Sequence, residues 1–163
     1  MKQELISQYG SALKMLINTT NQCPDNLWAD FNYISPYWQI TYHTLHYTAL
    51  YLSKNELAFS PPANHLPGIH RLGTLSITQN SDALQGGYSK IELQGYTTQI
   101  IGSLEQKIDE FNLAEPSGFE WLTMNKLELH LYNLRHLQHH IGQLIERLHQ
   151  NGIKGISWIG TTR

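Results

Sequence analysis

Apolar residues recur at intervals of three and four along four long stretches of this chain, and that spacing is the period of an α-helix. The last stretch, residues 125–151, shows it most clearly, because leucine and isoleucine return at heptad-like spacing with one break at Gln138. Comparable patterns predict helices over about residues 3–21, 36–53 and 89–111. Four helices of this length predict an all-α fold in which the helices pack as a bundle.

The segments between the predicted helices carry the residues that end helices. Ser35 is a plausible N-cap for the second helix, with Pro36 in its first turn. Residues 54–80 form a long irregular connection rich in proline, and long loops in compact domains are often functional. A second loop is expected over residues 112–124, and the tail from 153 to 163 is expected to pack back on the bundle as an extended segment.

Length and composition exclude several classes of protein. At 163 residues, the chain 1–163 fits a single domain. The net charge is -2 and no stripe of Lys or Arg could neutralise phosphates, so a nucleic-acid partner is not expected. Cys23 is the only cysteine, which excludes an internal disulfide and a thiolate zinc cage. With no secretory leader and no apolar run of roughly 18 residues, the sequence predicts a soluble, cytoplasmic protein without a membrane span.

Three histidines have the spacing of a metal site. His136 and His140 are one helical turn apart on the fourth helix, and His43 lies on the second helix in a segment too apolar to leave an imidazole unpaired cheaply. Three neutral imidazoles with an open position would form the catalytic type of site, and nitrogen ligands favour zinc, nickel or iron. The alternatives are polar residues at a helix seam and a core histidine bonded to a tyrosine or a backbone carbonyl.

Other polar residues lie near these positions and could serve several roles. His46 is one turn beyond His43 and could be a fourth ligand, a hydrogen-bond donor to a ligand or part of a pocket wall. His139 is expected to point away from the pair. Groups that could fix the imidazole tautomers are Gln39, Tyr47, Asn133 and Gln143. Exposed polar positions are expected for His65, His70, His130 and His149.

Two segments of the chain resemble the DinB-like family of bacterial metalloproteins. Residues 37–45 (YWQITYHTL) are similar to the segment with the family's first ligand, and residues 135–144 (RHLQHHIGQL) are similar to its double-histidine helix. The resemblance implies an up-up-down-down four-helix bundle with long connecting loops, often dimeric, and one divalent ion held by His43, His136 and His140. Many relatives carry an arginine where this chain has Ile141, so a contact made by that arginine is not implied here.

The same resemblance implies a range of activities rather than one. Relatives include thiol S-transferases, a thiol-dependent isomerase and proteins described as hydrolases. We therefore expect a metal-dependent enzyme that activates a small-molecule thiol or water for attack on an electrophile. The expected pocket is walled by the 54–80 loop, His46, Tyr47 and Trp158. The alternatives are a non-catalytic metal-binding or stress-response bundle protein, and a helical bundle that binds no ion.

Overall fold

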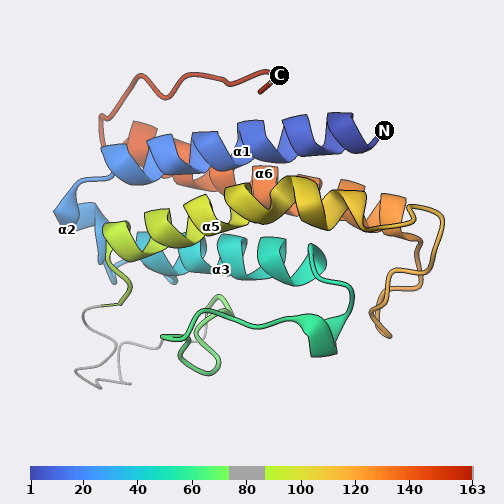
Figure 1. Ribbon diagram of the computed structural model, residues 1–163. Coiled ribbons are helices and arrows are strands. Elements are labelled where there is room, and N and C mark those ends of the chain that lie inside the picture. The colour runs from blue at the N-terminus through green and yellow to red at the C-terminus, as the bar shows by residue number, and fades with distance from the viewer. Residues whose placement is uncertain (74–86, 163) are drawn as a thin grey trace.

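The computed structural model describes residues 1–73 and 87–162, and this part of the chain is helical, which confirms the all-α prediction. Four long helices lie side by side (Figure 1). Within the described residues, the only β-type pairing is an isolated bridge between Pro116 and Asn125. The helices are α1 (Lys2–Gln22), α2 (Asp25–Trp28), α3 (Tyr37–Tyr51), the 3-10 helix η1 (Glu56–Ala58), α5 (Lys90–Asp109) and α6 (Lys126–Gln150).

The four long helices share one core. α1 packs against α5 and α6, and α3 packs against the same two helices, so α1 and α3 stand at opposite corners. The largest side chains that are fully buried between them include Trp38, Tyr9 and Tyr42. α3 is buried on nearly every side, as its apolar sequence predicts, and only His43 and Tyr47 within it keep partial exposure. The contact between α3 and α6 positions the candidate site.

The direction of the helices corrects one expectation. Lys2 at the start of α1 donates a hydrogen bond to the carbonyl of Asp109 at the end of α5, so these helices are antiparallel. Tyr9 of α1 meets His130 of α6 near the start of both, so α1 and α6 are parallel. Lys126 opens α6 and donates to carbonyls at the end of α3. The order is therefore up-down-down-up, as Figure 1 shows, and the expected up-up-down-down order was wrong.

The lengths of the connections explain this order. An up-up start would require the chain to travel back along α1, about 32 Å for a helix of 21 residues. The connection 23–36 spends part of its length on α2, a single short helix that the sequence did not predict, and returns the chain antiparallel. α3 and α5, which the long connection 52–89 separates in sequence, run parallel, as Figure 1 shows.

The ends of the helices agree closely with the sequence pattern, with one exception. α5 begins with a capping box in which Ser89 and Glu92 each bond the other's backbone N–H. At the start of α3, Pro36 occupies the N-cap position and Ser35 does not cap the helix. The hydroxyl of Ser35 instead accepts a hydrogen bond from the backbone N–H of Gly73. The predicted cap is therefore used to hold the long connection.

The connecting segments follow the predicted pattern where the structure describes them. Residues 54–73 are irregular apart from η1, and residues 74–80 of the predicted loop lie outside the described residues. The tail 153–162 has no helix and lies along α1 (Figure 1), where the Thr162 hydroxyl donates to the Ser7 carbonyl at 3.0 Å. Of the helices in the described residues, none combines the length and the hydropathy needed to cross a membrane.

Candidate metal centre

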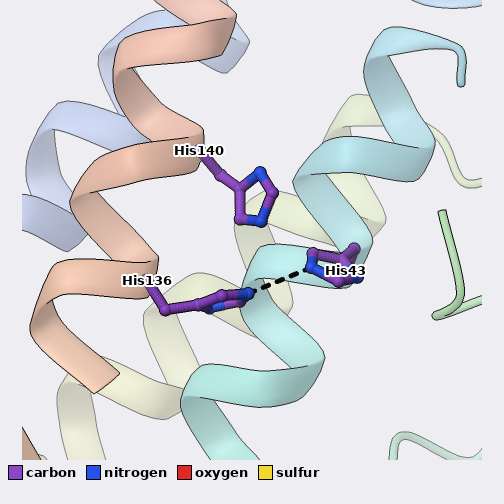
Figure 2. A group of neighbouring side chains, drawn as sticks. All are labelled: His43, His136 and His140. Carbon is purple, nitrogen blue, oxygen red and sulfur yellow. Dashed lines mark hydrogen bonds between the residues drawn. The ribbon is translucent and has the colours of Figure 1, made fainter. Parts of the chain in front are cut away.

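Three imidazoles meet where α3 faces α6. His43 comes from α3, while His136 and His140 come from successive turns of α6 (Figure 2). One ring nitrogen from each lies within 4.8 Å of the other two. The Nε2 atoms of His43 and His136 are 3.0 Å apart. The structure thus brings together the three residues that the sequence proposed as ligands.

The geometry of the three rings suits a shared ion. Two nitrogens bound to one tetrahedral zinc ion lie about 3.3 Å apart, because each Zn–N bond is about 2.0–2.1 Å. The ring planes of His43 and His136 are inclined by 50°, and those of His140 are inclined by 80° and 78° to the other two. Lone pairs lie in the ring planes, so inclined rings can direct them from different sides toward the common space seen in Figure 2. The arrangement is compatible with a divalent metal ion.

Hydrogen bonds assign the tautomer of two of the three rings. His43 Nδ1 is 2.6 Å from the carbonyl oxygen of His70, which can only accept, so Nδ1 carries the proton and Nε2 keeps its lone pair. His140 Nδ1 lies 3.0 Å from Oε1 of Gln143, with the same consequence. His136 Nδ1 is buried without a partner. Two rings are therefore oriented as ligands by contacts of the kind that metal-binding histidines commonly make.

Burial keeps these imidazoles neutral. Loss of hydration lowers the pKa of His43 from its usual value near 6.5 to about 4, and the pKa of His136 to about 3. Burial also lowers the pKa of His140. For His136, three neighbouring histidines, His140, His43 and His139, lower the pKa further, because a second positive charge would be unfavourable there. Neutral imidazole is the form that binds a metal ion, so none of the three rings has to lose a positive charge near pH 7.

The segment around His70 is fastened to α3 by three consecutive carbonyls. The buried amide of Gln39 donates to the carbonyls of Ile69 and Arg71, at 3.2 and 3.0 Å, and His43 donates to the carbonyl between them. Gln39 was predicted to orient a ligand directly. Its contacts show that it instead holds the backbone that orients His43.

The other proposed site residues differ in where they lie. The Tyr47 ring borders the group, with its centroid 4.9 Å from that of His43 and 5.6 Å from that of His136. Asn133 donates to a backbone carbonyl of α3 instead of a ligand. Trp158 is 70% exposed on the tail beside α1, and the structure does not bring it to the three histidines.

Three histidines that were expected to be exposed are not. His65 and His70 are partly buried and form a second group of three with His46, which is 6% exposed. His130 is fully buried and its Nδ1 lies 3.2 Å from the Tyr9 hydroxyl. His130 lies three residues after Leu127 and four before Leu134, so helical periodicity could have revealed its burial. No periodic signal exists for the two histidines in the irregular segment.

A groove of about 580 Å³ opens beside the centre. Gln143, which bonds His140, lines it together with Arg147 and Tyr33. The guanidinium of Arg147 is buried, stacks 4.0 Å over the Tyr33 ring and donates to the Ser35 carbonyl. Among the described residues it forms no ion pair with a carboxylate. The groove therefore contains a positive charge that makes no close ion pair in this part of the chain, although Asp30 attracts it from a greater distance.

Compared with protein-family models, with curated proteins and with solved structures, the chain gave no match. The resemblance to the DinB-like family consequently depends on the two segments described above and stays a prediction.

Proposed function

We propose that the protein binds one divalent transition-metal ion through His43, His136 and His140 and uses it to activate a thiol or water for attack on a small electrophile. The observation that carries this proposal is the convergence of three neutral imidazoles from two facing helices. In the described part of the chain, no fourth His, Cys, Asp or Glu joins the group at the same distance. Three protein ligands leave a coordination position for a reactant, as in catalytic zinc sites.

The chemistry divides between the ion and the chain. A bound divalent ion supplies Lewis acidity, which lowers the pKa of a thiol or water that it coordinates. His43 and His140 keep their Nε2 lone pairs directed at the centre, because His70 and Gln143 hold the opposite ring nitrogens. The Tyr47 ring packs beside His43 and His136, where it would restrict access of water to one side of the centre.

The groove beside the centre would hold the substrate. Gln143 lines the groove and bonds His140, which would place a bound molecule near the ion, and the guanidinium of Arg147, which makes no close ion pair with the described residues, favours a substrate with an acidic group. Small thiols and electrophiles that carry a carboxylate fit this description. As part of the proposal, we assign the helices to a four-helix bundle of the DinB-like type, supported by the two segments and by the three-histidine centre.

The first experiment measures metal content by elemental mass spectrometry in tag-free protein purified without added metal. We expect at least about one bound ion per chain. The number of bound ions should fall clearly when His43, His136 and His140 are all changed to Ala. His149→Ala is the matched control, because this histidine of α6 is exposed and belongs to neither histidine group. Protein that stays metal-free and also fails to bind added zinc, nickel or iron would contradict the proposal.

Turnover is tested next, with a small thiol and a chloronitroarene as electrophile. We expect His140→Ala to abolish turnover while circular dichroism shows an unchanged helical content. The second candidate function is metal binding without catalysis. Among the described residues, no carboxylate belongs to the three-histidine group, so no carboxylate there could act as a general base, and this favours the second candidate. Stoichiometric metal combined with no turnover of thiols or esters would support this second candidate.

A further inference from the structure

A second group of three histidines lies across Tyr47 from the first. His46 projects from α3, one turn after His43, and its partners His65 and His70 come from the irregular segment 59–73. One nitrogen of each ring lies within 4.8 Å of the other two. The Tyr47 ring contacts both groups, with its centroid 5.4 Å from His46 and 4.9 Å from His43.

The nitrogens of this second group lack the partners that buried imidazoles normally have. Nδ1 of His46 and Nδ1 of His70 are both buried and make no hydrogen bond. Only 6% of the surface of His46 is exposed. A buried polar atom without a partner costs free energy, and native proteins usually satisfy such atoms. Two unpaired nitrogens on facing rings are what a bound cation would satisfy.

We infer that His46, His65 and His70 form a second site for a divalent transition-metal ion, separate from the centre between α3 and α6. His65 Nδ1 lies 2.5 Å from the Tyr42 hydroxyl oxygen, which can accept a hydrogen bond from Nδ1–H and leave Nε2 of His65 for the ion. Within the described residues, no carboxylate or thiolate joins the group. An all-imidazole site of this kind suits zinc, nickel or copper better than magnesium or calcium.

The second site connects the irregular segment to α3. Gln39 bonds the carbonyls of the residues before and after His70, and His43 bonds the carbonyl of His70 itself. These contacts position the His70 ring beside His46 without an ion. An ion shared with His65 would fasten the same segment at a further point. The His70 carbonyl also bonds His43, so the same segment contacts both histidine groups.

The ring planes indicate that the second site is the weaker one. His46 and His70 stack with centroids 4.3 Å apart and planes inclined by 9°. The in-plane lone pairs of parallel rings do not converge, so one ring must turn before both can bind one ion. The first centre needs no such turn. Two divalent ions on neutral ligands also repel each other, so an ion at the first centre should weaken binding at the second.

The experiment is a titration of the full chain, stripped with chelator, with cobalt(II) and separately with zinc, counting bound ions per chain. We expect two ions for the wild type, with the second bound more weakly. His65→Ala should keep one ion, and His140→Ala should also keep one, bound more tightly than the second ion of the wild type. His149→Ala should keep two. His70→Ala repeats the test at a second ligand, and circular dichroism confirms folding of each variant.

The outcomes separate this inference from the proposed function. One ion in the wild type, lost in His140→Ala and unchanged in His65→Ala, would overturn the second site and leave the first. One ion lost in His65→Ala and unchanged in His140→Ala would support the second site and reject the proposed centre. Hydrogen exchange provides a second readout: ion binding should slow exchange in residues 59–73 of the wild type but not of His65→Ala.

Discussion

The hydrogen bond from His140 to Gln143 makes the sharpest prediction about the metal centre. Gln143 Oε1 lies 3.0 Å from His140 Nδ1, on the side of the ring opposite the proposed ligand atom. His140 is 7% exposed, whereas Gln143 is exposed at the rim of the groove. Gln143→Ala therefore removes the group that fixes the tautomer and the ring angle of a ligand without opening a cavity in the core.

The magnitude follows from what such contacts do in metal sites. Loss of a hydrogen-bond partner of a metal-binding histidine usually lowers metal affinity 10- to 100-fold, which is about 1.4–2.7 kcal/mol. Water can replace the lost acceptor at an exposed position, so we expect the lower end, about tenfold weaker binding. The free energy of unfolding of the metal-free protein should change by less than about 0.5 kcal/mol, because the altered side chain is exposed.

A competition titration against a chromophoric chelator measures the affinity, and urea unfolding in EDTA measures the stability of the metal-free protein. Gln150→Ala is the matched control, since Gln150 is an exposed residue of the same type on α6 and bonds only to Glu146 among the described residues. Unchanged affinity for the first ion in Gln143→Ala, together with loss of that ion in His140→Ala, would refute the idea that Gln143 orients this ligand. An equal loss of metal affinity in Gln143→Ala and Gln150→Ala would show that the effect is not specific to the contact between Gln143 and His140.

Three further predictions test the centre and the fold. His140→Ala should reduce the metal-dependent rise in thermal midpoint to the part that the second histidine group contributes, while leaving the metal-free midpoint within a few degrees, as calorimetry with and without zinc would show. His130 is fully buried, and burial lowers its pKa to about 4. The stability that its neutral ring provides is therefore complete above pH 6.5 and falls by about 3 kcal/mol as the pH drops toward 4. Urea unfolding in EDTA should show that the free energy of unfolding depends less on pH in His130→Leu than in the wild type. Gly118 has a φ of +86° and an added Cβ would collide with the Lys54 carbonyl, so Gly118→Ala should cost about 2–3 kcal/mol in urea unfolding, whereas Gly102→Ala, with open space in α5, should not destabilise.

The sequence predicted the helices well because their signals are local. Apolar periodicity placed each long helix within about two residues of its observed ends, and Ser89 marked the start of α5. The order of directions was not a local property. It depends on how the connection 23–36 folds, and α2 within it is too short to leave a periodic pattern. The expectation of an up-up start came from resemblance and had no support from the connection itself.

The candidate centre was predictable in part for a similar reason. A pair of histidines one turn apart on a helix must share a face, so His136 and His140 could be paired from sequence alone. The buried face of α6 was harder to predict, because it contains polar residues. His130 and Asn133 lie on the buried side, whereas Leu131 is 56% exposed. An apolar-only stripe therefore misplaced part of the buried face of this helix.

The polar stripe of α3 explains why the connection after it belongs to the site. Gln39, His43 and His46 lie at positions i, i+4 and i+7, which share one face of a helix that is largely buried. Such a stripe would be costly against an apolar neighbour, and it meets the carbonyls and rings of residues 65–71 instead. The segment thus satisfies the same helix face that supplies one ligand to each histidine group. A change that detaches this segment should therefore disturb both groups together, even where it touches no proposed ligand.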